Sequence, residues 1–374
     1  MRRVRQRAAK VRRVRRAVPF AVVVVALAAT AAAFAASGWP SAAQEVATSG
    51  IQKNIKFCGT KQITLAVEDG FGVNAWSQES YTAVKSTAAQ CKNVKVITAA
   101  GGGVESTATQ DIQSAVAQGA NAITVIPDFG SAELPAIQAA TKAGVKVVPW
   151  GANPGGVNGT DYVTYVDWND AYAGTVWANW MVQALHGHGN VIYTGGPAGN
   201  PVGADQLAAI VKVFAKHPGM KLLTGKTAWP VTNWDPTTAG TITAQLLSQY
   251  PKIDGIISNY GTDALASAQA FQKAGRKLVP IATLDANGLS CLYKSKKVPL
   301  QSISSRNWLG RIAARKAIAA AEGLKNLEPS LISLPPWEDT LNGKPYRCDP
   351  HAAADFYPSN KLTTAQIKRY GASS

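Results

Sequence analysis

The stretch AVAQGANAITVIPDFGSAELPAIQAATKAGVKVVPW, residues 115–150, decides the fold of this chain. Its apolar run Ala122–Ile126 is continuous and bounded by turn residues, which is typical of a strand buried on both faces. Helical spacing follows Ser131, the expected N-cap, and a second apolar run begins at Val145. The stretch therefore predicts a βαβ crossover with parallel strands and a right-handed connection.

The same alternation of strands and helices continues on both sides of this crossover. The sequence predicts further strands at Ile63–Val67, Val94–Thr98, Tyr162–Val166, Asn190–Thr194, Lys221–Thr227, Ile253–Ser258, Leu278–Thr283 and Leu300–Ser304. After Gly323 the chain is proline-rich and reads as an irregular tail with a short helix near Thr363–Arg369. Two successive arrays of about five strands indicate an α/β protein with two doubly wound parallel-sheet lobes.

The N-terminal segment has the layout of an export signal. Residues 1–36 contain nine basic side chains, no acidic one and a long apolar, alanine-rich run. We predict a secretory signal peptide over residues 1–43, cleaved near Ala33–Ala35 or Ser41–Ala43, with an uncleaved membrane anchor as the alternative. The protein is therefore expected to be exported to the periplasm, the cell envelope or the extracellular space.

Composition and charge exclude other classes. With 374 residues, 46% apolar and 16% charged, the chain can form two globular domains. The leader carries nine of the formal +16 charges, and the remaining +7 is spread along the chain without a basic run. Nucleic-acid binding is therefore not expected.

The four cysteines fit an exported protein. Cys58 precedes the first predicted strand and Cys91 follows the first predicted helix, so both lie at the same edge of a βαβ unit. This placement favours a Cys58–Cys91 disulfide and leaves Cys291 with Cys348. Metal binding is the competing interpretation, but no close Cys or His spacing supports it.

Five segments in this order resemble one known family. They are QGANAITVIPD…ELPAIQAATKAGVKVV, YVDWNDAYAGTVWANWM, GNVIYTGGPAGNPVGADQLAAIVKVFAKHPGMKLL, YPKIDGIISNYGTDALASAQAFQKAG and VPIATLDANG. The chain resembles the periplasmic sugar-binding proteins of the ribose-binding type, which are related to the effector domain of lactose-repressor-type regulators. The resemblance covers roughly residues 61–322.

The resemblance implies two lobes joined by three crossings, near Trp168, near Ser305 and after Gly323. We place a linker at residues 44–60. Lobe 1 spans residues 61–167 plus about 306–325, and lobe 2 spans residues 168–305 plus the tail at about 326–374. The family also implies a small solute held between the lobes and delivered to an ABC-type permease, by a monomer without cofactor or metal.

Candidate ligand-binding residues come from tryptophans near strand ends and from matches to the family. Aromatic rings stack on the apolar C–H faces of sugars, whereas hydroxyls need amide or charged partners. Asn74 and Trp76 match the family's first-loop contacts, and Asp285 matches its second-lobe carboxylate. The full set is Asn74, Trp76, Asp128, Trp150, Trp168, Trp234, Tyr260, Asp263, Asp285, Arg306 and Asn307.

The chain departs from the family in its charged residues. The family's Asp-Arg pair after the fourth strand is Trp150-Gly151 here, and its second-lobe arginine falls at about Ala204. Arg306 either replaces the lost arginine or faces solvent. We therefore expect a ligand other than a common pentose or hexose held in the ribose manner, such as a deoxy sugar, a glycoside or another polar metabolite.

Two functions remain open on the sequence. One is an exported solute-binding protein for a carbohydrate-like ligand, and the other is an extracellular sensor that presents its bound solute to a membrane receptor. An enzyme is not expected, because no phosphate loop or nucleophile elbow occurs.

Overall fold

The computed structural model describes residues 55–371, all of which belong to one unit of the chain, Gly38–Ser374. The predicted leader and most of the predicted linker lie outside the described residues. Within the described range, no helix combines the length and hydropathy needed to cross a membrane.

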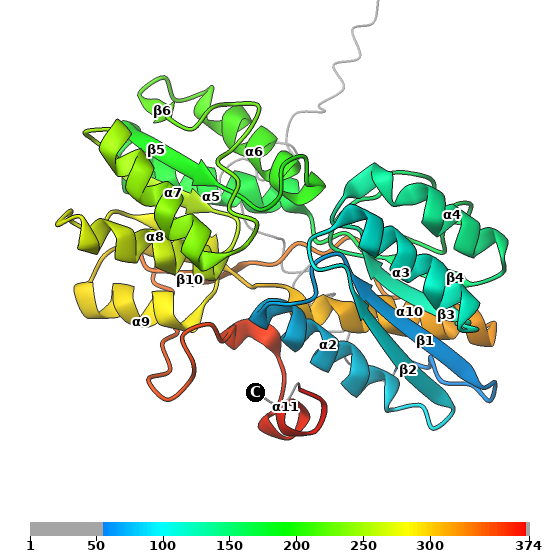
Figure 1. Cartoon of the computed structure of the whole chain (residues 1–374). Helices are drawn as coiled ribbons and strands as arrows, with labels where there is room; N and C mark the ends of the chain where they lie inside the picture. The colour runs from blue at the N-terminus through cyan, green and yellow to red at the C-terminus, as the bar shows by residue number, and fades with distance from the viewer. Residues whose placement is uncertain (1–54, 372–374) are drawn as a thin grey trace, which may run out of the picture. The chain divides into compact units, whose positions relative to one another are not determined.

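The first lobe is a four-stranded parallel sheet with the order β2-β1-β3-β4. Its strands are β1 (Ile63–Asp69), β2 (Val94–Ala100), β3 (Ala122–Ile126) and β4 (Lys146–Pro149). Its helices are α2 (Ala75–Ala88), α3 (Glu105–Ala117), α4 (Leu134–Lys142) and α10 (Gly310–Glu322). Helix α10 is distant in sequence from the other helices of this lobe, and it packs against α2 and the sheet (Figure 1).

The crossover that opened the sequence analysis is confirmed. β3 and β4 pair in parallel, with Ala122 opposite Lys146, and α4 connects them. All five residues of β3 are buried, as its continuous apolar run predicts. Gly144 ends the helix at a φ of +93°, a backbone conformation that side chains with a Cβ disfavour.

The second lobe is a six-stranded sheet with the order β10-β9-β8-β7-β5-β6. Its strands are β5 (Gly189–Thr194), β6 (Met220–Leu222), β7 (Gly255–Ser258), β8 (Ile281–Leu284), β9 (Leu300–Ile303) and β10 (Pro336–Asp339). Its helices are α5 (Asp170–Ala184), α6 (Pro201–Phe214), α7 (Pro236–Gln249), α8 (Gly261–Lys273) and α9 (Asn287–Lys296). Five strands are parallel, and β10 closes one edge in the antiparallel direction.

Three sequence predictions are wrong in detail. Tyr162–Val166 is not a strand, because only Val163 and Val166 donate backbone hydrogen bonds to β4 and no continuous ladder forms. Ser131 is no N-cap, since it lies inside a 3-10 turn, Gly130–Ala132, and Glu133 precedes α4. The sequence analysis also missed α9, although Leu289, Leu292 and Tyr293 have helical spacing and pack on the core.

The tail after α10 is more ordered than predicted. It contains β10, a 3-10 turn at Pro358–Asn360 and helix α11 (Thr364–Tyr370). β10 was missed because its sequence PWED has no strand alternation. Figure 1 shows α11 beside α2 of the first lobe, at the end of a segment that starts on the second lobe.

Three passages of the chain connect the lobes and bond to one another. The backbone N–H of Asp167 donates to the carbonyl of Ser330 at 2.7 Å, and the N–H of Ile332 donates back to Asp167 at 2.8 Å. A guanidinium N–H of Arg306 donates to the carbonyl of Trp168 at 3.1 Å. These contacts lie at the three crossings that the family resemblance implies.

Both predicted disulfides are present. Cys58 bonds Cys91 beside the first strand, and Cys291 on α9 bonds Cys348 in the tail. The second bond closes a longer loop, with a sequence separation of 57 against 33 residues.

Removing the tail disulfide is expected to destabilise the protein. In the variant with both Cys291→Ser and Cys348→Ser, we expect the free energy of unfolding to fall by about 2–4 kcal/mol, because the unfolded chain regains the entropy of an open loop. Chemical denaturation measures the change. The matched control is Cys58→Ser with Cys91→Ser, for which the shorter loop predicts a smaller loss. Equal stability of the Cys291/Cys348 variant and the wild type would contradict the expectation.

Candidate functional site

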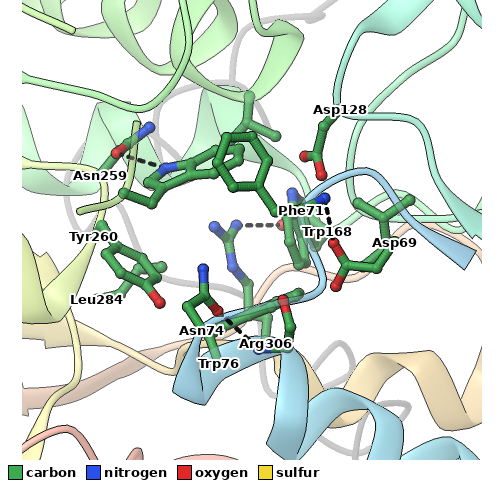
Figure 2. A pocket seen from close by; sticks show the side chains of 14 residues that line it. Asp69, Phe71, Asn74, Trp76, Asp128, Trp168, Asn259, Tyr260, Leu284 and Arg306 are labelled. Carbon is green, nitrogen blue, oxygen red and sulfur yellow. Dashed lines mark hydrogen bonds between the residues drawn. The ribbon is translucent and has the colours of Figure 1, made fainter. Parts of the chain in front are cut away.

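A cavity lies where the carboxyl ends of the strands of both lobes meet (Figure 2). This is the position at which doubly wound sheets bind ligands. The lining residues are Asp69, Phe71, Asn74, Trp76, Ser77, Ile126, Asp128, Trp168, Val202, Trp234, Asn259, Tyr260, Leu284 and Arg306.

The first lobe contributes two carboxylates. Asp69 ends β1, and its Oδ1 accepts backbone N–H groups of Phe71 at 2.9 Å and Gly72 at 2.8 Å. Asp128 follows β3, and the side-chain amide of Asn200 on the other lobe donates to its carbonyl at 2.7 Å. Asp128 thus lines the cavity at a direct contact between the lobes.

Asn74 connects the start of α2 to the cavity. Its Oδ1 caps the helix by accepting the N–H of Ser77 at 2.9 Å. The amide nitrogen of Asn74 points to the cavity side in Figure 2. The oxygen of the Asn74 amide therefore caps the helix, and the nitrogen is a hydrogen-bond donor on the cavity side.

Three tryptophans from distant parts of the sequence form one aromatic cluster. The ring of Trp76 stacks on Trp150 at 5.9 Å with an interplanar angle of 22°, and Trp168 meets both rings edge-on. Trp76 and Trp168 line the cavity, whereas Trp150 lies behind them and is buried. The cluster gives the cavity a rigid apolar wall.

The opposite wall is also aromatic. Trp234 packs edge-on against Phe71 of the first lobe at 4.7 Å, and its indole N–H donates to Asn259 at 3.3 Å. Trp234 has a left-handed backbone with a φ of +52°. Its ring occupies the space that a Cβ at Gly196 would fill. A strained backbone at a residue whose ring fills such a specific space is typical of a functional position.

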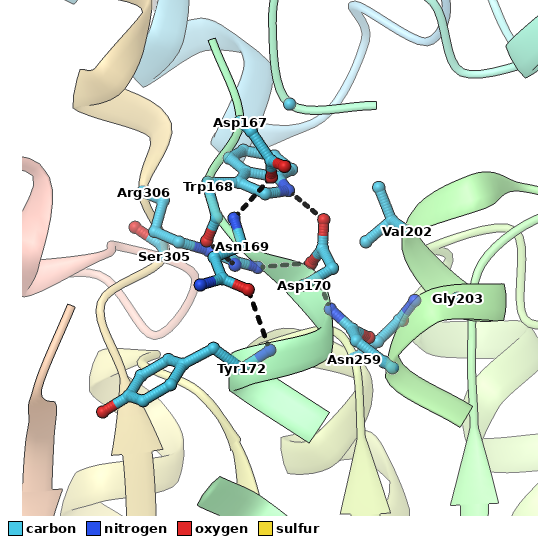
Figure 3. Close-up of polar contacts among 12 residues, drawn as sticks. Asp167, Trp168, Asn169, Asp170, Tyr172, Val202, Gly203, Asn259, Ser305 and Arg306 are labelled. Atoms are coloured by element: carbon cyan, nitrogen blue, oxygen red, sulfur yellow. Dashed lines mark hydrogen bonds and ion pairs between the residues drawn. The ribbon is translucent and has the colours of Figure 1, made fainter. Parts of the chain in front are cut away.

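Arg306 enters the cavity from a crossing between the lobes. It is 1% exposed, has a left-handed φ of +65°, and places its guanidinium 4.4 Å from the centroid of the Trp168 ring. One guanidinium N–H donates to the Trp168 carbonyl, and another donates to Asp170 Oδ1 at 3.2 Å (Figure 3). The sequence left its orientation open, and the structure places it in the lining.

Asp170 is the buried counter-charge of this arginine. Its carboxylate accepts the indole N–H of Trp168 and the side-chain amide of Gln206, the latter at 2.7 Å (Figure 3). Three donors, from Trp168, Gln206 and Arg306, therefore satisfy one carboxylate at the start of α5. Such a fully bonded ion pair fixes both the arginine and the indole against which a ligand would lie.

Three buried polar atoms among the lining residues have no partner in the described part of the chain. They are Oδ2 of Asp69, Nδ2 of Asn259 and Nε of Arg306. Buried polar groups are normally paired. The acceptor is on the first lobe, one donor is on the second lobe, and the other donor is on a crossing. These atoms therefore point to a ligand that carries hydrogen-bonding groups on several sides.

A cluster of buried acids lies behind Asp69 and Asp128. Burial raises the pKa of Glu68 well above its ordinary value, and Glu133, Asp69 and Asp128 raise it further. Burial likewise raises the pKa of Asp128, and brings that of Glu133 to about 7. No basic residue contributes to these shifts, so the first lobe presents acidic groups to the cavity without a compensating cation.

Seven of the eleven predicted residues line the cavity. They are Asn74, Trp76, Asp128, Trp168, Trp234, Tyr260 and Arg306. The structure places the other four, Trp150, Asp263, Asp285 and Asn307, outside the lining, and each has a different local role.

These four residues hold neighbouring parts of the fold. Trp150 supports Trp76 from behind, and Asp263 accepts the hydroxyl of Thr232. Asp285 accepts hydrogen bonds from Ser305 and from Ser359 of the tail. Asn307 donates its side-chain amide to Glu79 at 2.8 Å. Sequence position at a strand end predicted proximity to the cavity correctly but not the direction of the side chain.

Sequence reasoning left out several lining residues. Asp69, Phe71 and Asn259 line the cavity but were not among the residues predicted from the sequence. Their shared signal is a polar or aromatic residue directly after an apolar strand. Asp170 gave no such signal. Acidic residues are common in the first turn of a helix, because they interact favourably with the helix dipole.

The described residues offer no metal site: nowhere in 55–371 do three or more His, Cys, Asp or Glu side chains gather in a metal-binding arrangement. What the cavity provides is hydrogen-bond donors and acceptors between aromatic faces. This combination suits a small, polar, uncharged molecule with apolar C–H faces.

Comparison of the sequence with known families and proteins gives one consistent result. Residues 70–325 match the family described as periplasmic binding protein domain. A xylitol-binding protein of Mycolicibacterium smegmatis is 27% identical over 238 residues, which are 63% of this chain and 65% of that protein. The alignment thus spans just under two thirds of the relative's length.

Solved structures show the same fold. The arabinose-binding component of an ABC transporter from a Shewanella species, bound to L-arabinofuranose, has a TM-score of 0.65 at 20% identity over 73% of this chain and 90% of that one. A solute-binding protein from Bacillus halodurans with bound myo-inositol has a TM-score of 0.66 at 17% identity, over 74% of this chain and 95% of that one.

The acid cluster predicts that stability falls as pH rises. The pKa values of Glu68, Asp128 and Glu133 are raised in the folded state, so their protonated forms favour folding and this contribution is lost as pH rises. For Glu133 the loss runs from the ordinary value of 4.5 to about 7. Glu68→Gln removes one of these charges and is expected to flatten the pH profile and raise Tm at pH 8 by about 2–4 °C per kcal/mol gained.

Thermal unfolding between pH 5 and 8 measures this. Asp355→Asn, at an exposed position of the tail, is the control and should leave the profile unchanged. Parallel profiles for wild type and Glu68→Gln would show that the cluster does not titrate in this range.

Proposed function

The chain belongs to the periplasmic binding protein family, and from that premise we propose that it captures a small uncharged polyhydroxy compound, a sugar or sugar alcohol, between its lobes. The observation that supports this most is the cavity with unpartnered atoms on Asp69, Asn259 and Arg306 between two aromatic walls. Hydroxyl groups can both donate and accept, so one ligand class satisfies all three atoms.

The electrostatics of the cavity argue against an anionic ligand. Asp69 and Asp128 line it, whereas the single lining cation, Arg306, is already paired with Asp170. The guanidinium of this arginine bonds the Asp170 carboxylate and the Trp168 carbonyl, so its charge is already neutralised within the protein.

A sugar alcohol is the first candidate within this class. The relative from Mycolicibacterium smegmatis is a xylitol-binding protein, and two structural neighbours hold arabinofuranose and myo-inositol. The aromatic walls suit the C–H faces of such molecules, and the polar atoms suit their hydroxyls.

We further propose that the protein delivers its ligand to an ABC-type permease. The relatives support this role, since one of them is the binding component of an arabinose ABC transporter. We assign the protein no catalytic activity, an exported location and a monomeric state. The sensor role is the second candidate, and one structural neighbour is the fructose-binding domain of a hybrid two-component system.

The lobe boundaries follow from the same proposal. We assign residues 61–167 and about 306–325 to lobe 1, and residues 168–305 with the tail to lobe 2. The packing of α10 on the first sheet supports the first assignment. The crossings then serve as the hinge about which ligand binding closes the lobes.

Ligand binding can be tested by thermal shift. Xylitol, myo-inositol and L-arabinose are expected to raise Tm, because a ligand at about 100 times its Kd stabilises the folded state by about 2.7 kcal/mol. Xylonate and amino acids should give no shift. A shift by an amino acid or a sugar acid, with none from any sugar or polyol, would overturn the ligand class.

Asp69→Asn should weaken binding of the sugar or polyol that gives the largest shift. The substitution keeps an acceptor for the Phe71 and Gly72 amides but replaces the unpartnered Oδ2 with an amide nitrogen, so we expect about a 10- to 100-fold higher Kd. Isothermal titration calorimetry measures it. The control Asp161→Asn lies in a loop outside the cavity lining, and an unchanged Kd in Asp69→Asn would remove Asp69 from the site.

A further inference from the structure

The C-terminal tail passes directly beneath the ligand cavity. On the second lobe, the side-chain amide of Asn287 donates to the carbonyls of Asp349, Ala352 and Ala353, and its backbone N–H donates to Phe356. Together with the Cys291–Cys348 disulfide, these bonds hold the tail on α9 until it turns toward the first lobe.

Ser359 is the central contact of the tail with the hinge. Its backbone N–H and its hydroxyl donate to the two oxygens of Asp285, at 2.9 and 2.8 Å. The same hydroxyl lies 2.7 Å from the Ser304 hydroxyl and accepts the backbone N–H of Ser305 at 3.1 Å. All four residues are buried, so these bonds are shielded from water.

From Ser305 the contacts lead to two residues of the cavity lining. The carbonyl of Ser305 accepts the indole N–H of Trp76 at 2.9 Å. Arg306 directly follows Ser305 in the sequence and has a left-handed backbone. The hydrogen bonds that fix Ser305 therefore act on the residue next to Arg306. The tail, Asp285 and Ser305 thus form one layer directly behind Trp76 and Arg306.

A second contact reaches the other wall. Tyr357 is fully buried, and its ring lies 5.9 Å from the ring of Tyr260, a lining residue. Its hydroxyl is 3.4 Å from the hydroxyl of Thr262. Tyr357 therefore fills the space behind Tyr260 without lining the cavity itself.

The tail then attaches to the first lobe. Glu79 of α2 accepts the backbone N–H of Tyr357 at 3.1 Å and the side-chain amide of Asn360 at 2.8 Å. The guanidinium of Arg311 on α10 donates to the carbonyl of Lys361 at 3.1 Å. The tail is therefore a fourth connection between the lobes, made by side chains as well as by the backbone.

We propose that the segment Tyr357–Asn360 is a positioning element of the ligand cavity, which sets the places of Trp76, Arg306 and Tyr260 without touching the ligand. This inference rests on the proposed function for its effect on affinity. It assigns Asp285 a positioning role, through Ser359 and Ser305, in place of the direct ligand contact expected from the sequence.

The first test needs no ligand. In the full chain with ¹⁵N-labelled tryptophan, Ser359→Ala is expected to shift the indole N–H signal of Trp76 and to speed its exchange with solvent about tenfold, because the Ser305 carbonyl loses its fixed position. The indole of Trp180, which donates to Asp339 on the far side of the second lobe, should not change. The control variant Ser295→Ala is at an exposed position of α9.

The second test measures affinity for xylitol and myo-inositol by calorimetry. Ser359→Ala is expected to raise Kd about tenfold at a temperature where the variant is fully folded, and Ser295→Ala should leave it unchanged. Should Ser359→Ala fail to fold, Tyr357→Leu and Tyr357→Phe replace it. Loss of the ring should weaken binding, whereas loss of the hydroxyl alone should not.

The two tests separate this inference from the proposed function. An unchanged Trp76 signal with unchanged Kd in Ser359→Ala, or equal Kd in Tyr357→Leu and the wild type, overturns the positioning role. A wild type that binds neither probe while Trp76 still responds to Ser359→Ala overturns the proposed ligand class and supports the positioning role.

Discussion

The buried ion pair between Arg306 and Asp170 is the interaction on which the cavity depends. It joins a crossing between the lobes to the first turn of α5 and holds the guanidinium on the ring of Trp168. Removing one partner of such a pair leaves an uncompensated buried charge, at a cost of about 3–5 kcal/mol. The same arginine carries an unpartnered Nε at the cavity. One side chain therefore belongs both to a crossing between the lobes and to the cavity lining.

The cavity combines fixed walls with a few open polar atoms. Its aromatic rings are held by one another and by hydrogen bonds to backbone carbonyls, as with Trp76 and Ser305. Preorganised walls reduce the entropy that a ligand must remove on binding. The proposed neutral polyhydroxy ligand fits this arrangement, since Asp69 and Asp128 line the cavity and Arg306 is paired with Asp170.

Asp285 illustrates why a family match does not transfer a role. Its position after β8 matches the family's ligand carboxylate, yet both of its oxygens accept hydrogen bonds from the tail. The tail is a segment that the sequence analysis took as irregular. Its β10 strand, disulfide and 3-10 turn bring Ser359 under the hinge, more than 70 residues after Asp285 in the sequence. No local pattern around Asp285 contains this information.

The sequence by itself determined the two parallel sheets, the crossover over residues 115–150, the disulfide pairing and half of the residues of the cavity lining. These features depend on local periodicity and on the rule that parallel strands end at one edge. Only the tertiary structure decided which strand-end side chains face the cavity, that Trp150 lies behind Trp76, and that Arg306 is buried against Asp170. Such choices depend on partners distant in sequence, and local spacing carries no record of them.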